Sequence, residues 1–244
     1  MPTNVLSFGN AKGKFARPFW SVVALVLAGV LALFLPLDAP PGALADRLLW
    51  YSSNLGAFVA AWSVQMVAML TLSAVLACAA WLARLSHPLS AFLAGTSLLI
   101  ATVAFIIPKF IAIWSIPQMV VASSTVTSHA AVAESLFQIL NPSLAFSLFT
   151  AFDYLGFWMY GVAALLLVAP LLRLTLSTRI AAISLGLYGV LYHLLLFGVL
   201  SGGVATEVIG SYAEGIAMLL FIPVLGIAVY CRGQLRQVAA QATL

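Results

Sequence analysis

Four ionisable side chains occur inside segments that are otherwise apolar: Lys109, Asp153, His193 and Glu214. A charged group in hydrocarbon costs about 2.5–3.5 kcal/mol even on the mildest scale, so each of them needs a partner or a water-filled cavity. If the four groups meet, a carboxylate, an ammonium and an imidazole together could pass on a proton or hold a small polar solute. Whether they meet depends on the elements that carry them.

The composition of the chain places these elements in a membrane. Of the 244 residues, 64% are hydrophobic and only 7% are charged, whereas a soluble domain carries about 25% charged residues. A soluble chain this apolar would have too little polar surface to cover its core. We therefore expect an all-α integral membrane protein that forms a single membrane domain over residues 1–244.

Six segments are apolar enough and long enough to cross a bilayer as helices, which takes about 20 residues. Turn or charge signals separate them, and the alternating pattern of barrel strands is absent. The predicted transmembrane helices are 19–37, 55–83, 89–115, 146–172, 180–200 and 212–231. The first has the basic flank of a signal peptide, but its apolar run is long and no clear cleavage site follows, which favours a retained helix. Residues 1–18 and 232–244 are then tails.

The basic residues predict the orientation. With the N-terminus in the cytoplasm, the basic residues of both tails and of two loops lie inside: Lys12, Lys14, Arg17, Arg84, Arg173, Arg179, Arg232 and Arg236. Arg47 falls in a predicted outer loop, and the acids Asp38, Asp46 and Glu207 are interpreted as solvated loop charges. This pattern favours a bacterial-type cytoplasmic (inner) membrane with both termini cytoplasmic. It explains the net charge of +4 without a nucleic-acid partner, because no fold presents a basic patch.

The predicted topology brings the four ionisable groups to one depth in the outer leaflet. At 1.5 Å per residue, Asp153 lies about 12 Å into the fourth helix and His193 about 10 Å from the outer end of the fifth. Lys109 lies near the outer end of the third helix, and Glu214 lies in the first turns of the sixth. The shared depth makes this layer the candidate polar site.

Within that layer the simplest pair is Asp153 with Lys109, and His193 is a natural third member because nearby carboxylates would favour its charged form. Tyr154 and Tyr192 supply hydroxyl groups at or just below the same depth. Together these side chains predict a polar layer that is open to the outside.

Each of the four ionisable residues also has a structural interpretation. Lys109 could extend to the outer headgroups, and Glu214 could favour the positive end of a helix dipole. His193 could be a neutral core histidine bonded to a carbonyl, and Asp153 could make a purely structural hydrogen bond between helices. The sequence leaves these alternatives open.

The connection from 116 to 142 contains no Lys or Arg and only two titratable groups, His129 and Glu134. A connection of this length without structure would be unusual. Apolar residues recur at helical spacing over 128–140, which predicts a short amphipathic helix on the outer face between the third and fourth spans. This segment is a candidate lid over the polar layer, and the alternative is a covering loop with no gating role.

The motifs of known chemistry are missing. The sequence contains no GxSxG, HExxH or P-loop pattern, and its three histidines lie at different depths, so we expect no metal and no cofactor. Cys78 and Cys231 come near the cytoplasmic ends of their helices and lack CxxC spacing, which favours core packing over a disulfide.

Three classes of function remain as hypotheses. The first is a small-solute or proton-coupled transporter, or a channel component, that uses the polar layer. The second is a non-catalytic subunit or sensor that packs against a membrane-protein partner or a second copy of the chain. The third is a membrane enzyme that acts on a lipid or quinone, with Asp153 and His193 as acid and base. The first is favoured, and the chain leans away from catalysis.

Overall fold

The computed structural model describes residues 5–32, 34–40, 42–123, 130–142 and 144–241, and every regular element in these ranges is helical. The main helices are α1 (Val5–Ala32), α2 (Leu44–Ala83), α3 (Pro88–Phe110), α4 (Ile116–Ser123), α5 (Ala130–Ile139), α6 (Leu148–Leu172), α7 (Leu176–Leu200), α8 (Ile209–Ala217) and α9 (Phe221–Gln241). A π-helix, η1 (Ile111–Ser115), joins α3 to α4, while the 3-10 turns η2 (Thr206–Val208) and η3 (Met218–Leu220) flank α8.

Five of the helical stretches are long and apolar enough to cross a membrane: Leu44–Ala83, Pro88–Ser123, Leu148–Leu172, Leu176–Leu200 and Thr206–Gln237. The prediction of a membrane helical bundle is therefore supported. The predicted first span, 19–37, corresponds to a shorter apolar stretch of α1, Pro18–Ala32, because the helix ends before Pro36.

Local signals explain where several helices begin. Pro88 occupies the first turn of α3, where its missing N–H costs nothing. The Ser147 hydroxyl accepts a hydrogen bond from the backbone N–H of Thr150 at the start of α6, at 3.1 Å. At the start of α7 the Thr178 hydroxyl accepts a hydrogen bond from the backbone N–H of Thr175, at 2.9 Å, as one half of a capping box.

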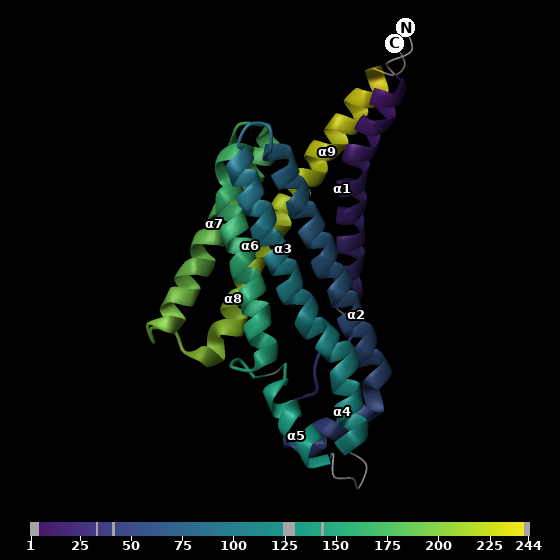
Figure 1. The fold of residues 1–244 in the computed structure, drawn as a ribbon, viewed down its shortest axis with the longest axis vertical. Helices are drawn as coiled ribbons and strands as arrows, with labels where there is room; N and C mark the ends of the chain where they lie inside the picture. Colours follow the sequence, from purple (N-terminus) through teal and green to yellow (C-terminus); the bar gives the residue numbers. More distant parts are fainter. Residues whose placement is uncertain (1–4, 33, 41, 124–129, 143, 242–244) are drawn as a thin grey trace.

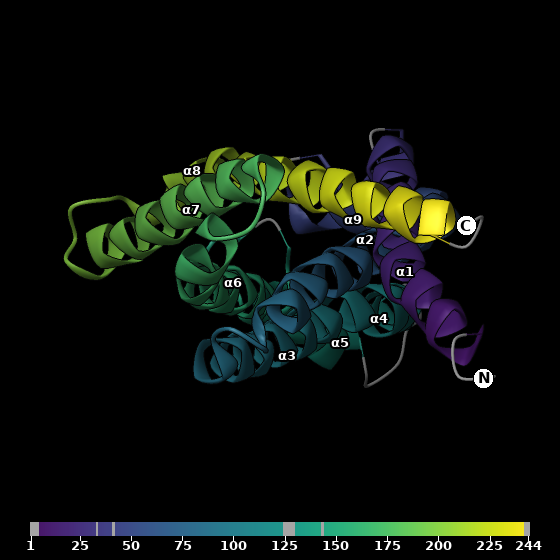
Figure 2. The ribbon, with the colours of Figure 1, turned by 90° about the horizontal axis from the view of Figure 1, so that it is seen from above.

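The helices form a bundle whose termini lie together at one end (Figure 1). α6 packs against both α3 and α7, and α9 packs against α7 and α1. Seen from above, α7, α8 and α9 line one side of the molecule and α3 the other, with α6 between α3 and α7 (Figure 2). The main core is formed by the inner faces of α2, α3, α6, α7 and α9.

Glycine allows α6 and α7 to approach closely. A Cβ atom added to Gly189 would lie 2.6 Å from the Leu165 side chain and 2.9 Å from the Gly161 carbonyl oxygen, so only glycine fits there. Small residues at helix contacts are the usual means of close packing in a membrane. Below this contact α7 leans away from α6 towards its C-terminal end (Figure 1).

Several helices are longer than the sequence predicted: α1 begins at Val5 and α9 ends at Gln241, so both extend into the predicted tails 1–18 and 232–244. α2 begins at Leu44 rather than at 55, and the helix that contains α3 continues through η1 and α4 to Ser123 rather than ending at 115. At 1.5 Å per residue the 40 residues of α2 extend over about 60 Å, against a hydrocarbon core of about 30 Å. α2 and α4 therefore project beyond the end of α7, where they hold α5 (Figure 1).

This projecting part, which we call the outer cap because it lies at the end of the bundle farthest from the start of α1 and the end of α9 (Figure 1), has its own aromatic core. Tyr51, Phe58 and Trp62 of α2 pack with Phe137 of α5 and Phe149 of α6, and successive ring centroids lie 5.0–6.2 Å apart. The predicted helix over 128–140 is present as α5. Its buried residues, Ala133 and Phe137, pack into this cap.

Candidate functional site

Lys109 and Asp153 form an ion pair between α3 and α6. Lys109 lies in the last turn of α3, and Asp153 lies in the second turn of α6, so the two helix ends bring the charges together. The side chains are only 4% and 21% exposed. The structure thus joins the pair that the sequence suggested, and Lys109 does not extend to the headgroups.

The ammonium of Lys109 is enclosed by aromatic rings. Its Nζ lies 5.1 Å from the centroid of Phe105 and 5.7 Å from that of Trp62. A lysine ammonium has three N–H donors, and only the one directed at Asp153 meets an oxygen of the described residues. The two ring surfaces attract a cation but replace its hydration only in part.

The helix that carries Lys109 is irregular at this point. Pro108 has no backbone N–H to donate, and the π-helix η1 begins two residues after Lys109. π-helical turns are rare and frequently occur at functional sites, because the wider turn frees backbone groups and redirects side chains. The cation therefore lies beside a stretch of backbone that can change its hydrogen bonding.

The two predicted tyrosines lie on the other side of Asp153. The Tyr192 hydroxyl of α7 donates to the backbone carbonyl of Tyr154 on α6, at 3.2 Å. Both phenol groups lie within electrostatic range of the Asp153 carboxylate. Tyr192 is fully buried, whereas Tyr154 lines a groove on the surface of the bundle.

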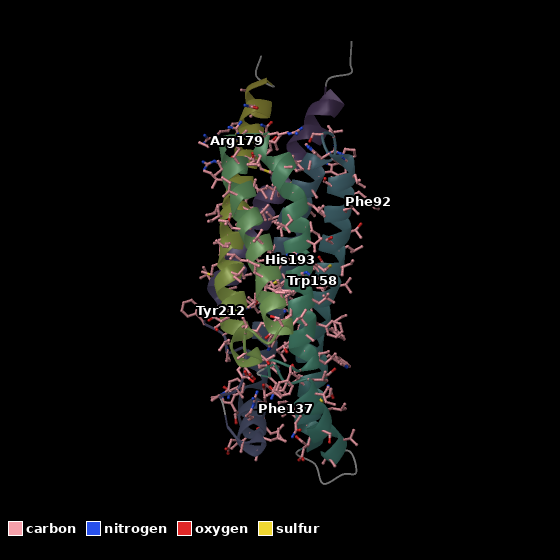
Figure 3. All side chains as sticks on the ribbon, turned by 90° about the vertical axis from the view of Figure 1, so that its left-hand side faces the viewer. Phe92, Phe137, Trp158, Arg179, His193 and Tyr212 are labelled. Carbon is pink, nitrogen blue, oxygen red and sulfur yellow. The ribbon has the colours of Figure 1, made fainter. Side chains whose placement is uncertain are left out.

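His193 makes a local contact and does not join the ion pair. Its Nδ1 lies 2.7 Å from the backbone carbonyl of Gly189, one turn earlier on α7. The ring meets Trp158 edge to face, with centroids 6.4 Å apart. Figure 3 shows these two side chains close together, between Arg179 at one end of the bundle and Phe137 towards the other.

The other predicted members lie elsewhere. Glu214 is exposed on α8, in the second turn rather than the first, so the helix dipole does not explain its position. Glu134 of the candidate lid is exposed on α5, at the rim of a pocket that it shares with Ser52 and Ser123. His129 lies outside the described residues.

A second buried charge cluster was missed by the sequence analysis. Arg47, assigned to an outer loop, lies in the first turns of α2 with only 8% of its surface exposed. Its Nη2 donates to the Asp38 carboxylate at 2.8 Å and to the Asn141 side-chain oxygen at 3.0 Å. The Tyr51 hydroxyl also bonds to Asp38. Asp38 is therefore not a solvated loop charge. It is the centre of a hydrogen-bonded cluster that joins the segment before α2 to the segment after α5.

The membrane core holds a hydroxyl network as well. The Ser73 hydroxyl of α2 lies 2.6 Å from the Tyr160 hydroxyl of α6 and accepts a hydrogen bond from Thr102 of α3 at 2.9 Å. Tyr160 is fully buried. Hydroxyls on three adjacent helices thus satisfy one another, which is the usual solution for polar groups in a membrane.

The two cysteines are free and lie in contact. Cys78 of α2 and Cys231 of α9 lie close enough for their thiols to interact electrostatically, and Cys231 is fully buried. The sequence predicted packing positions for both but gave no sign that they would meet, because the two residues lie far apart in the chain.

The predicted layer is thus divided by the structure into a closed ion pair, a tyrosine contact, a histidine in a separate groove and an exposed acid. No hydrogen bond or ion pair joins Asp153 to His193. Such an arrangement can hold a buried charge pair and release it when a helix moves. Comparison of the chain with protein-family models, with curated protein sequences and with solved structures found no match.

Proposed function

We propose that this membrane protein crosses the bilayer with six helices and moves a proton or another small solute, with the Lys109–Asp153 pair as the element that binds and releases charge. α1 is the sixth span in this proposal, because its apolar stretch Pro18–Ala32 continues into Phe34 and Leu35. The single observation that carries the proposal is a buried ammonium with one oxygen partner beside a π-helix.

Keeping this ion pair buried costs free energy. Replacing a buried ion pair by apolar residues of similar size is often neutral or stabilising by about 1–4 kcal/mol. A charged pair inside a membrane segment is thus an expensive way to hold α3 to α6, and such residues mark ion and proton pathways. Protonation of Asp153 would break the pair and leave the ammonium to aromatic faces that hold it weakly.

The proposed orientation has both termini in the cytoplasm of a bacterial-type cell. Both termini lie at one end of the bundle (Figure 1), and Arg179 lies towards the end opposite the outer cap (Figure 3). Basic residues are retained on the cytoplasmic side, so the outer cap would face away from the cytoplasm.

Proton flux into vesicles is the direct test. Purified protein is placed in vesicles that contain a pH-sensitive dye, and a potassium diffusion potential is applied. We expect the wild type to acidify the lumen and Asp153→Asn to abolish the flux, because an amide cannot release a proton. Asp46→Asn is the matched control, since Asp46 is an exposed aspartate of α2. Equal flux through wild type and Asp153→Asn would contradict the proposal.

A non-catalytic subunit or sensor is the alternative, and the closure of the ion pair favours it. Side chains that are 4% and 21% exposed are what a structural tie between α3 and α6 would show. In that case the protein should elute from mild detergent with a partner or as a dimer. A monomer without a partner, active in vesicles, would remove this alternative.

A further inference from the structure

An apolar groove lies between α6, α7 and the start of α8, separate from the ion pair. It has a volume of about 490 Å³ and is lined by residues of the first half of α6 and the last turns of α7. Its lining includes Tyr154, Trp158, His193, Phe197 and Ile209. Aromatic and aliphatic side chains make up most of the wall, and no lysine, arginine, aspartate or glutamate contributes to it.

The hydrogen bond of His193 fixes which ring nitrogen carries the hydrogen. A backbone carbonyl can only accept, so Nδ1, which lies 2.7 Å from the Gly189 oxygen, must be the donor. In the neutral ring the other nitrogen, Nε2, is then an acceptor. Packing holds the ring in this position, because its Cε1 and Nδ1 atoms lie beside Gly161 and the ring makes an edge-to-face contact with Trp158.

Nε2 has no hydrogen-bond partner among the described residues, and it is not one of their enclosed unpaired atoms. It is therefore accessible from outside the protein. Nδ1 bonds to the α7 backbone and His193 is one of the residues that line the groove, so Nε2 is the ring nitrogen left to bond to a ligand there. The groove thus offers one fixed nitrogen acceptor, together with the hydroxyl-bearing residues Tyr154 and Thr206, in a wall that is otherwise apolar and largely aromatic.

These features select a ligand by its chemistry. An uncharged wall disfavours phosphate or ammonium headgroups, which would be stripped of water without a counter-charge. The His193 acceptor requires a donor on the ligand, and the rings of Trp158, Tyr154 and Phe197 offer faces and edges for a flat ring. The ligand must also reach the groove through the membrane, because exposed apolar side chains such as Phe197 and Leu200 border it.

We propose that this groove binds the reduced, quinol form of a membrane quinone, with a ring hydroxyl donating to His193 Nε2 and the apolar tail leaving towards the lipid. This site contains neither Lys109 nor Asp153, and the proposal does not rest on the transport proposal. The oxidised quinone carries only carbonyl acceptors at these positions, so the site distinguishes the two redox forms by the direction of one hydrogen bond.

The test compares a short-chain benzoquinol with its dimethyl ether on the full-length protein in detergent, kept under an oxygen-free atmosphere. The ether has the same ring and tail but no donor. Quenching of tryptophan fluorescence measures both affinities. We expect the quinol to bind the wild type about tenfold more tightly than the ether, the value of one hydrogen bond.

Three variants make the result decisive. His193→Phe keeps an aromatic ring but removes the acceptor, so quinol and ether should bind equally, whereas His87→Phe, a histidine at the other end of the bundle, should keep the difference. Ala151→Phe adds a ring to an exposed residue of the groove wall and should weaken both ligands. Equal affinity of quinol and ether for the wild type, an unchanged difference in His193→Phe, or unchanged binding to Ala151→Phe would overturn the proposal.

Discussion

Arg47 and Lys109 are both buried cations paired with an aspartate, yet they differ in the number of oxygen atoms that accept hydrogen bonds from them. Arg47 meets Asp38, Asn141 and Tyr51 with a single terminal nitrogen. Lys109 meets Asp153 and two aromatic rings. A cation that donates to several oxygens from different segments holds those segments together and is structural. A cation that is paired with a single carboxylate loses its partner when that carboxylate is protonated. The difference separates a structural ion pair from a candidate functional one.

The largest effect on stability is expected at the Arg47–Asp38 pair. Asp38→Ala leaves a guanidinium that is 8% exposed with only neutral partners, and we expect a loss of about 3–5 kcal/mol in the free energy of unfolding. Thermal or denaturant unfolding in mild detergent measures it. Asp46→Ala is the control, because that carboxylate is exposed and its loss should change stability by less than about 0.5 kcal/mol. A small loss of stability in Asp38→Ala would contradict the distinction between a structural pair at Arg47 and a releasable pair at Lys109.

Replacing both partners should separate the pairs most clearly. Lys109→Met with Asp153→Leu exchanges one ion pair for apolar side chains in an aromatic setting, and we expect stability to change by no more than about 1 kcal/mol or to rise. Arg47→Met with Asp38→Leu should remain destabilising, because Asn141 loses its hydrogen bond to Arg47 and Tyr51 loses its hydrogen bond to Asp38. Unfolding of both double variants under one condition tests the contrast. Equal losses would contradict it.

Glycine contacts offer a test of the bundle that holds the second pair. Gly189→Ala would place a methyl group 2.6 Å from Leu165, whereas Gly186→Ala meets only Val168 at 3.4 Å. We expect the first to cost about 1–3 kcal/mol and the second to be close to neutral. Unfolding measurements on the two single variants distinguish them, and similar costs would place the close contact of α6 and α7 elsewhere.

The smallest effect concerns coupling between the pairs. Arg47 and Trp62 are about 22 Å apart along α2, but Trp62 touches both regions: its Nε1 donates to the Leu37 carbonyl at 2.9 Å, and its ring faces Lys109. We expect the changes in unfolding free energy caused by Asp38→Ala and Asp153→Asn to be additive within about 0.5 kcal/mol. A larger interaction energy in the double-mutant cycle would show that Trp62 transmits strain between them.

The apolar runs of the sequence were sufficient to predict a membrane helical bundle and the short helix near 128–140. They misplaced the start of α2, because Arg47 and its neighbours were interpreted as loop residues. The outer part of α2 satisfies Arg47 through residues at positions 38 and 141. Such long-range partners cannot be derived from local hydropathy.

The positions of the candidate site residues along their helices were predictable from the sequence, but the directions of their side chains were not. Counting residues along helices correctly suggested that Lys109 and Asp153 would meet, since both were near helix ends at the same level. The same counting included His193, whose ring is held by the Gly189 carbonyl on its own helix. Depth follows from the rise per residue, whereas the direction of a side chain depends on how each helix is rotated, which one sequence does not reveal.

The π-helix between Lys109 and α4 has a consequence for the surface of the cap. A π-turn accommodates about one more residue than an α-turn, and one residue corresponds to a rotation of about 100° around the helix axis. Every side chain after Ser115 is therefore turned by roughly a quarter of a circle relative to an uninterrupted helix. The face of α4 that carries Ile116 and Val120 towards the aromatic core of the cap is thus set by one extra residue in the helix backbone.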